Sequence, residues 1–324
     1  MKLLCYQPKN SEKENIGVLI KDTIYNLNAA FGNITMIDLI QLKDFKNQIT
    51  KYLNCNDVQT CKMNEVSLLS PIPKPSSFRD AYSFRDHVET ARRNRGLDMI
   101  PEFDVFPVFY FGNHNAILGP NDDVYCEKDH FEDLDYELEI AIVIGKKGKN
   151  ILAKDALKYI AGVTILNDMS ARKLQREEMK LNLGPAKGKD FANILGPYLV
   201  TLDEIDKKSF IDKNHIGKKY DLEMRCSING EVISTGNMKT MHWTFSEIIE
   251  RVSYGVEIYP GDIIGSGTVG GGCFLEINGS EKKKNNNYKE RWINEGDIIE
   301  MEIEGIGKIS NQIIRSNNNH SILK

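Results

Sequence analysis

Asp135-Tyr136-Glu137-Leu138-Glu139-Ile140-Ala141-Ile142-Val143-Ile144 places two glutamates directly before the longest uninterrupted apolar run of the chain. We expect this run to be a strand of the core. Successive side chains of a strand face opposite ways, so Glu137 and Glu139 would project from one face about 7 Å apart. Carboxylates at a strand end are commonly solvated. A functional pair would instead hold a hard divalent cation such as Mg²⁺, Mn²⁺ or Ca²⁺.

Length and composition limit the class of protein. The 324 residues are 41% hydrophobic and 27% charged, the balance of a folded, water-soluble chain with a sizeable core. A net charge of −4 without a long basic stretch makes a nucleic-acid partner a poor expectation. The six cysteines form no C-x-x-C pair, which indicates reduced thiols. The chain starts without the apolar core of a secretory signal, and no run could cross a bilayer, so we expect a cytoplasmic protein with no membrane partner.

Strands outnumber helices among the predicted elements. The β-type runs are Val105 to Phe111, Tyr136 to Gly145, Gly196 to Leu202, Leu222 to Ile228, Gly261 to Ile264, Ile298 to Ile303 and Ile309 to Ile314. The predicted helices are Ser83 to Asn94, Ala153 to Tyr159, Ser170 to Lys180 and Thr244 to Tyr254. Because the two kinds do not alternate regularly, a doubly wound parallel sheet is disfavoured, and we expect a β-rich α+β sandwich or roll.

A proline cluster divides the chain. The segment Pro71-Ile72-Pro73-Lys74-Pro75-Ser76 fixes extended backbone and removes amide donors, which suits a linker into a new unit. We therefore expect a small N-terminal α+β domain over residues 1–70, with a helix around Met36 to Leu53, and a main domain over residues 71–324.

Two further acidic residues lie beside groups that could do chemistry. Asp168 follows an apolar strand and precedes a predicted helix, where it could simply accept free helix amides. Arg172 and Gln175 lie three residues apart on that helix and could donate hydrogen bonds to an anion above Asp168. Asp80 precedes the predicted helix that carries His87, a residue type that can act as a base near neutral pH but is more often structural.

One glycine-rich stretch resembles a nucleotide-binding fingerprint without its context. Gly265-Ser266-Gly267-Thr268-Val269-Gly270 fits G-x-G-x-x-G, but that fingerprint needs a following helix. Here the strand-like run Cys273 to Ile277 comes next, so a tight loop that lines a site is favoured over a nucleotide site. The polar segment Glu281 to Asn287 is expected to be a solvated hairpin tip.

Taken together, these motifs resemble the fumarylacetoacetate hydrolase family from residue 71 to the C-terminus. The matching motifs, in chain order, are Asp80-x-Tyr82 with His87, Glu137-Leu138-Glu139, Asn167-Asp168-x-Ser170-Ala171-Arg172 with Gln175, and Gly188-Lys189-x-Phe191. The resemblance implies a mixed β-sandwich roll that usually forms a homodimer. This agrees with the β-rich fold class expected from the strand pattern.

The resemblance also implies roles for individual residues. The metal, Mg²⁺ or Ca²⁺ with Mn²⁺ as a further option, would be bound by Asp80, Glu137, Glu139 and Asp168. Substrate contacts would come from Tyr82, Arg95, Tyr110, Gln175 and Thr268. His87 would be the general base, while Lys189 and Arg172 would supply positive charge to the substrate.

Family members hydrolyse carbon–carbon bonds of 1,3-diketo acids, decarboxylate oxaloacetate, or isomerise or hydrate related oxo acids. The hydrolases similar to this chain pair the histidine with a glutamate after a G-T segment. Glu276 follows Thr268 in that way, although it could also be an ordinary exposed strand residue. We therefore expect a metal-dependent hydrolase that cleaves a small acylpyruvate or 1,3-diketo acid.

In that mechanism His87, oriented by Glu276, would deprotonate water, and the developing charge would be stabilised by Arg172, Gln175 and Lys189. One alternative is an oxaloacetate decarboxylase or an oxo-acid hydratase or isomerase, for which the His87–Glu276 pair would be unnecessary. Another is a non-catalytic metal-binding protein with the same fold. Turnover on a small oxo acid separates the enzymes from that last alternative.

Overall fold

The quoted stretch forms the centre of the largest sheet. Strand β11 (Leu138–Ile144) is buried along its whole length in the computed structural model, which describes residues 1–323. It pairs antiparallel with β13 (Ile160–Asp168) on one side and with β21 (Ile263–Gly265) on the other. Strand β11 is apolar on both faces beyond its first residues because Ile140 and Ile142 pack into one core cluster, whereas Ala141 and Val143 pack into another.

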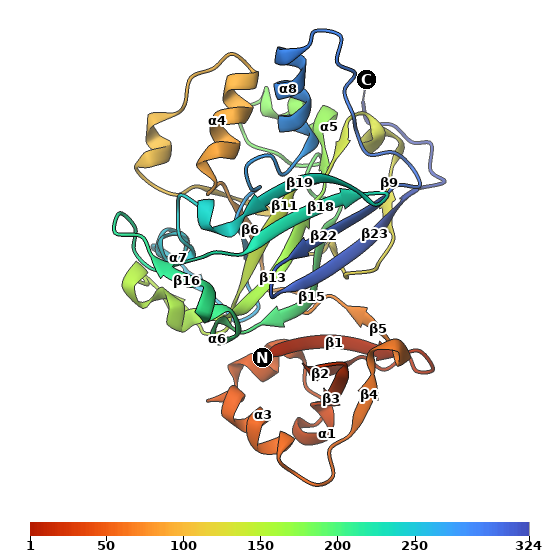
Figure 1. Cartoon of the computed structure of the whole chain (residues 1–324), viewed down its shortest axis with the longest axis vertical. Helices are drawn as coiled ribbons and strands as arrows, with labels where there is room; N and C mark the ends of the chain where they lie inside the picture. The colour runs from red at the N-terminus through yellow and green to blue at the C-terminus, as the bar shows by residue number, and fades with distance from the viewer. Residues whose placement is uncertain (324) are drawn as a thin grey trace.

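The large sheet runs in the order β4-β3-β2-β1-β15-β13-β11-β21-β6-β7, with β5 paired to β1 and β8 paired to β15. The N-terminal strands join it where Lys2 and Leu3 of β1 pair with Val200 and Leu199 of β15. Figure 1 shows this N-terminal part, coloured red to orange, below the rest of the molecule. The domain boundary at residue 70 stays a prediction.

A second sheet packs against the first. Its order is β19-β18-β22-β23-β9, and its strands β22 and β23 contact β13 and β15 of the large sheet. The core between them includes Ile140 and Ile142 from β11 and Met301 and Ile309 from the second sheet. The expected β-rich α+β fold of packed sheets is therefore confirmed.

The strands of the large sheet are β1 (Lys2–Pro8), β2 (Asn15–Ile20), β3 (Thr23–Asn26), β4 (Thr60–Lys62), β5 (Val66–Leu69), β6 (Phe78–Ala81), β7 (Phe109–Gly112), β8 (Ile117–Leu118), β11, β13, β15 (Asn193–Val200) and β21. Those of the second sheet are β9 (Val124–Cys126), β18 (Glu223–Ile228), β19 (Glu231–Asn237), β22 (Ile298–Ile303) and β23 (Gly307–Arg315). Short two-stranded pairs are formed by β10 (Leu134–Asp135) with β14 (Ser170–Ala171), β12 (Gly148–Lys149) with β20 (Glu257–Ile258), and β16 (Ser209–Ile211) with β17 (Lys218–Tyr220).

The α-helices are α1 (Asn28–Phe31), α2 (Met36–Gln41), α3 (Phe45–Leu53), α4 (Arg85–Asn94), α5 (Arg172–Met179), α6 (Leu202–Ile205), α7 (Phe245–Ser253) and α8 (Phe274–Lys284). The longest 3₁₀ segment is η4 (Ala153–Tyr159), and shorter ones are η1 (Met63–Glu65), η2 (Pro101–Asp104), η3 (Lys128–Phe131), η5 (Asp206–Lys208) and η6 (Met238–Thr240). Helices α4, α5 and α8 lie together at one end of the molecule (Figure 1). No helix among residues 1–323 is long and apolar enough to span a bilayer.

Two of the expected elements differ in extent. The single helix expected around Met36 to Leu53 is observed as two helices, α2 and α3. Asp44 between them has a left-handed backbone with a φ of 57°, which interrupts the helix. The strand over Val105 to Phe111 is shorter than expected, since β7 begins only at Phe109, after the 3₁₀ turn η2.

The segment after the glycine-rich loop was predicted wrongly. Residues Cys273 to Ile277 are not a strand, because α8 begins at Phe274 and runs to Lys284. The segment Glu281 to Asn287 is accordingly not a hairpin tip but the last turn of α8 and the turn after it. A helix therefore does follow the G-x-G-x-x-G stretch. The glycine-rich stretch itself lies against a buried acidic residue, because the Gly267 amide donates to Asp80.

Candidate active site

A cavity of 1020 Å³ opens beside the helices α4, α5 and α8. Ten of the thirteen site residues expected from the sequence line it: Asp80, Tyr82, His87, Arg95, Tyr110, Glu137, Arg172, Gln175, Lys189 and Thr268. The other three, Glu139, Asp168 and Glu276, are at most 2% exposed and contact lining residues from behind. The structure thus brings all the expected residues to one place.

Four buried carboxylates meet at the floor of this cavity. Asp80 comes from β6, Glu139 from β11, Asp168 from the end of β13, and Glu137 from the residue before β11. One ligand oxygen from each lies within 4.8 Å of the others. Sheet register explains the convergence, because β6, β21, β11 and β13 are successive neighbours in the sheet.

The close approach of these strands depends on a glycine. Gly265 of β21 pairs with Asp80 on β6 and with Ala141 on β11. A Cβ atom at Gly265 would lie 2.3 Å from the Asp80 carboxylate oxygen Oδ1, so no larger residue fits there without moving Asp80. The glycine-rich loop therefore serves the carboxylate cluster.

The four carboxylates have different charge environments. Burial alone would raise the pKa of Glu137, but the nearby positive charges of Lys189 and Arg172 outweigh burial and lower it to about 2. Burial and the charge of Asp168 raise the pKa of Asp80 to about 8. Burial and the charge of Asp80 likewise raise the pKa of Glu139 well above its ordinary value. Like charges packed this closely away from water disfavour full ionisation unless a cation joins them.

The cluster fits a hard divalent cation. Glu139 Oε2 and Asp168 Oδ1 are buried and have no hydrogen-bond partner among the described residues. Buried polar atoms are normally paired, so these orphan oxygens indicate a missing partner. Carboxylate oxygens without a thiol or imidazole among them are the donor set that Mg²⁺, Ca²⁺ and Mn²⁺ prefer.

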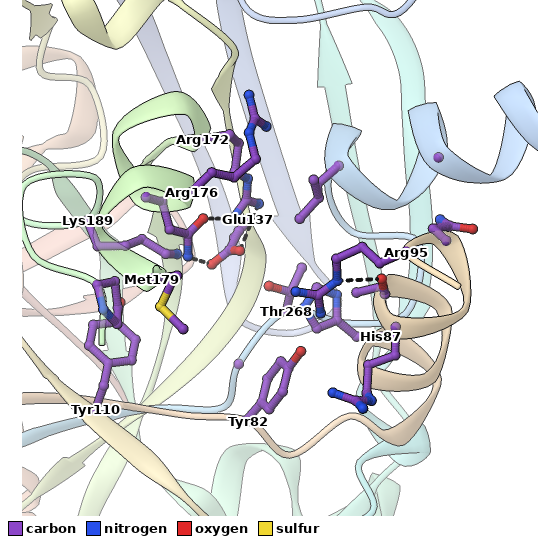
Figure 2. Close-up of a pocket in the computed structure, with 18 of the residues that line it drawn as sticks. Tyr82, His87, Arg95, Tyr110, Glu137, Arg172, Arg176, Met179, Lys189 and Thr268 are labelled. Carbon is purple, nitrogen blue, oxygen red and sulfur yellow. Dashed lines mark hydrogen bonds and ion pairs between the residues drawn. The ribbon is translucent and has the colours of Figure 1, made fainter. Parts of the chain in front are cut away.

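Two positively charged side chains and a tyrosine contact the carboxylate cluster. Lys189 is 4% exposed, and its Nζ donates to Asp168 Oδ2 at 2.8 Å and also to Glu137. Arg172 donates to Glu137 Oε1 at 2.8 Å, and the hydroxyl of Tyr110 donates to Asp168. Figure 2 shows Lys189, Glu137 and Arg172 joined in this way on one side of the cavity.

A histidine–glutamate pair lies on the other side. His87, on α4, places Nδ1 2.5 Å from Oε1 of Glu276 on α8. The second carboxylate oxygen of Glu276 accepts the Gly271 amide at 3.1 Å. Glu276 is therefore not an exposed strand residue. Because Nδ1 is occupied, Nε2 is the nitrogen of His87 that remains for a proton-transfer partner.

The remaining expected residues surround the same space. The ring of Tyr82 meets that of His87 edge to face, with the centroids 5.5 Å apart. Arg95 follows the last turn of α4, and its Nε donates to the Ala91 carbonyl oxygen at 3.0 Å. Thr268 donates a long hydrogen bond of 3.4 Å to Glu139. Figure 2 shows Tyr82, Arg95 and Thr268 near His87.

The structure changes what was expected of three residues in or before α5. Asp168 does not cap α5, because the helix begins four residues later and has no side-chain cap. Gln175 accepts a hydrogen bond of 3.0 Å from Arg172 through Oε1, so only its amide nitrogen is left to donate. Arg172 is almost fully buried and bonded to carboxylates, which places it behind the cavity surface more than the sequence suggested.

Asp135 is a buried site residue that the sequence analysis did not single out. It is fully buried, bonds Arg172, and accepts backbone amides at the start of α8. Its signal was available, because it is the third acidic residue at the head of the strand that carries Glu137 and Glu139. The partner helix α8 had been predicted as a strand, so no local pattern connected Asp135 with it.

Comparison with known proteins identifies the family. Residues 76–314 match the model of the fumarylacetoacetate (FAA) hydrolase C-terminal domain. The chain belongs to this family. This confirms the resemblance seen in the four motifs and supports an enzyme of this family.

Named relatives span most of the chain. The oxaloacetate tautomerase YisK of Bacillus subtilis is 31% identical over 78% of this chain and 74% of its own length. The mitochondrial oxaloacetate tautomerase Fahd2a of Rattus norvegicus is 27% identical over 97% of this chain and 92% of its own length. Because that relative is named as mitochondrial, the cytoplasmic location of this protein stays a prediction.

A solved structure supports the same fold. The fumarylacetoacetate hydrolase of Exiguobacterium antarcticum superimposes with a TM-score of 0.71 at 25% identity, over 98% of this chain and all of the other. Tautomerases and a hydrolase are thus both among the similar proteins. Family membership therefore does not by itself decide between the expected carbon–carbon hydrolysis and the other reactions of the family.

Proposed function

We propose that this protein is a divalent-metal-dependent enzyme that interconverts the keto and enol forms of a small 2-oxo dicarboxylic acid, with oxaloacetate as the substrate. The observation that carries the proposal is one cavity that holds both the buried carboxylate cluster and the His87–Glu276 pair. Similarity over most of the chain to proteins named oxaloacetate tautomerases supports this reaction over others.

The metal would be held by Asp80, Glu137, Glu139 and Asp168, and Mg²⁺, Mn²⁺ or Ca²⁺ suits these oxygens. When bound, such a dication supplies positive charge that favours the enol form of a 2-oxo acid. Lys189 and Arg172 would add positive charge toward the carboxylates of the substrate, and Tyr82, Arg95, Tyr110, Gln175 and Thr268 would orient it.

The proton transfer falls to His87. Its Nε2 takes a proton from carbon 3 of the keto acid, and the electron pair of that bond forms the carbon–carbon double bond of the enol. The carbonyl electron pair moves onto the oxygen of carbon 2, and the protonated His87 gives its proton to that oxygen, so the reaction is balanced without a co-reactant. Glu276 holds the imidazole by Nδ1 and stabilises its protonated form, which is the usual role of a carboxylate behind a histidine base.

The direct test uses oxaloacetate in its enol form. The ultraviolet absorbance of the enol falls as it converts to the keto form, and the enzyme should accelerate this decay in the presence of Mg²⁺ or Mn²⁺. Chelator-treated protein should lose the acceleration, and added metal should restore it. A decay rate equal to that of buffer, at full metal occupancy, would overturn the proposal.

Carbon–carbon hydrolysis is the second candidate, because a histidine held by a carboxylate as in the His87–Glu276 contact could equally activate a water molecule. His87 would deprotonate a water molecule, hydroxide would add to the distal carbonyl of an acylpyruvate, and the bond to carbon 3 would break. The electron pair would pass to the pyruvate enolate, which then takes up the proton from His87.

A substrate panel separates these reactions. Acylpyruvates and fumarylacetoacetate report hydrolysis by loss of the diketone absorbance, whereas pyruvate released from oxaloacetate reports decarboxylation. In Glu276→Gln protein, hydrolysis should be lost, whereas decarboxylation should largely remain. Absence of turnover on every oxo acid of the panel would instead favour a non-catalytic metal-binding protein. The homodimer implied by the family resemblance remains a proposal, which light scattering of the purified protein tests.

A further inference from the structure

Asp135 lies between the carboxylate cluster and the His87–Glu276 pair, and all of its hydrogen-bonding capacity is used. Oδ1 accepts the backbone amides of Phe274 at 2.8 Å and of Tyr136 at 3.0 Å. Oδ2 accepts the amide of Leu275 at 3.0 Å and Nε of Arg172 at 2.8 Å. Four donors on one fully buried carboxylate fix its position and orientation.

Arg172 continues the connection toward the metal-binding carboxylates. Its guanidinium contacts Asp135 Oδ2 and Glu137 Oε1, each at 2.8 Å, and also bonds Gln175. A planar guanidinium holds two carboxylates in a more fixed relative orientation than an ammonium on a flexible stem. Arg172 therefore connects one oxygen of Glu137 to Asp135, while Lys189 bonds the other oxygen.

Asp135 also fixes the start of α8. The first amides of a helix have no partner within it, and the residue before α8, Cys273, provides no side-chain cap. Asp135, in β10, accepts two of these amides, those of Phe274 and Leu275, and its negative charge suits the positive end of the helix. Glu276, which holds His87, directly follows Leu275.

We propose that Asp135 is a positioning residue that fixes the His87–Glu276 pair relative to the metal-binding carboxylates. The inference rests on the proposed function, because it assigns Asp135 to the same proton transfer. Asp135 touches neither substrate nor metal in this assignment. It acts in one direction through α8 on Glu276, and in the other through Arg172 on Glu137.

A purely structural role makes a different prediction. If Asp135 were only a helix cap, its loss would lower stability but would leave the pH dependence of turnover and the affinity for metal unchanged. A matched control is Thr35, whose side chain accepts the Asp38 amide at the start of α2 and lies outside the cavity. Thr35→Ala should lower the melting temperature slightly and leave kcat and metal affinity as in wild type.

The test variant is Asp135→Asn in the full chain. Asparagine has the same size but lacks the charge, and its amide group cannot accept from all four donors. We expect kcat on oxaloacetate to fall about 10- to 100-fold, the range seen when a partner behind a metal ligand is removed. KM should change less, and the pH profile of kcat should shift, because Glu276 no longer holds His87 in one orientation.

Metal binding gives a readout that does not depend on activity. Without Asp135, the charge of Arg172 acts on Glu137 alone and competes with the cation for that carboxylate. The affinity of metal-free protein for Mn²⁺, followed by electron paramagnetic resonance, should therefore fall about tenfold in Asp135→Asn and remain unchanged in Thr35→Ala.

A double variant tests the route through Glu276. If Asp135 acts through Glu276, the loss of kcat in the combined Asp135→Asn and Glu276→Gln protein should be smaller than the product of the two separate losses. If Asp135→Asn does not fold, Arg172→Lys weakens the same connection from the other end, since lysine lacks the guanidinium group by which Arg172 bonds both Asp135 and Glu137. That variant should also shift the pH profile.

The inference is overturned if Asp135→Asn, or Arg172→Lys in its place, loses stability but keeps the wild-type pH profile and Mn²⁺ affinity. Failure of the proposed function looks different. In that case the wild-type protein itself shows no turnover, and the Mn²⁺ titrations alone decide whether Asp135 governs the carboxylate cluster.

Discussion

Glu137 and Glu139 stand two residues apart at the start of one strand, yet their surroundings are opposite. Glu137 bonds Lys189 and Arg172, and its pKa is lowered to about 2. Among residues 1–323, Glu139 forms no ion pair and its Oε2 has no hydrogen-bond partner, and its pKa is raised by burial and by the charge of Asp80. The charge of Glu137 is therefore neutralised by side chains of the protein, whereas the half of the cluster formed by Glu139 and Asp80 is not.

This difference shows how the site can be both stable and open to a cation. The pairs with Lys189 and Arg172 keep Glu137 ionised and fixed at all physiological pH values. The half that contains Glu139 and Asp80 stays short of positive charge, which is the condition for binding a dication from solution. The following predictions test this division, beginning with a variant that should affect neither half.

Replacement of His87 should give the largest effect on turnover. Asparagine keeps a polar side chain but cannot take up a proton, so His87→Asn should lower kcat by about 10²- to 10⁴-fold. Metal content after dialysis should match that of the wild type, because His87 is not among the four carboxylates. Steady-state kinetics and metal analysis of the same preparation check both points. A fully active variant would remove His87 from the mechanism.

Glu137→Gln should lower the stability of the folded protein. The change leaves Lys189 and Arg172 buried with one fewer negative partner, and breaking a buried ion pair in this way costs about 3–5 kcal/mol. Urea unfolding of metal-free protein measures the loss in the free energy of unfolding. Stability equal to that of the wild type would mean that Asp168 and Asp135 alone suffice to hold the two cations.

Glu139→Gln should have the opposite effect on stability. The neutral amide removes a charge that burial and Asp80 disfavour, so metal-free protein should gain on the order of 1 kcal/mol, the usual size of a stabilising substitution. The same change removes a metal-binding oxygen and should weaken Mn²⁺ affinity by at least about tenfold. If both glutamine variants lose stability to the same degree, the division between the two halves is wrong.

The stability of metal-free protein should fall as the pH rises from about 4 to about 8. The ordinary pKa of an aspartate is 3.8 and that of Asp80 in the folded protein is about 8, so between these values the folded state holds a proton that the unfolded chain has released. Such a group lowers the free energy of unfolding by up to about 1.4 kcal/mol per pH unit over that window. Glu137, with its lowered pKa of about 2, adds stability above pH 4.5 that is lost only at lower pH.

Thermal unfolding in a pH series, with and without Mg²⁺, measures this slope. Saturating Mg²⁺ displaces the proton from the cluster and should flatten the curve. An Asp80→Asn variant serves as the control, because its metal-free curve should be flatter than that of the wild type. Stability of the metal-free wild type that rises over this range would contradict the raised pKa values.

Several core strands and most residues of the site could be predicted from the sequence. A continuous apolar run located β11, and short β-type runs located β18 and β22. The ordered motifs around Asp80, Glu137, Asp168 and Lys189 indicated one cavity. The strand runs and the short motifs can be recognised from neighbouring residues in the sequence, without knowing which distant segments are in contact.

The features that were missed depend on distant contacts. Helix α8 begins after a run of glycines and has no cap of its own, since its first amides are bound by Asp135 from another strand. The contrast between Glu137 and Glu139 likewise depends on Lys189 and Arg172, which lie far along the chain. Two identical side chains in one motif cannot be distinguished until those neighbours are known.

The smallest effect on turnover and metal affinity should come from Tyr110, whose hydroxyl contacts the carboxylate cluster through its hydrogen bond to Asp168. The Tyr110 hydroxyl donates to Asp168, which also accepts Lys189 at 2.8 Å, so Tyr110→Phe removes one of two hydrogen bonds and leaves the ion pair. A single such hydrogen bond contributes about 0.5–1.5 kcal/mol. Turnover or KM for oxaloacetate should change by less than about tenfold, and Mn²⁺ affinity should change as little. A loss as large as that of His87→Asn would mean that the Tyr110 hydroxyl itself transfers a proton to the substrate.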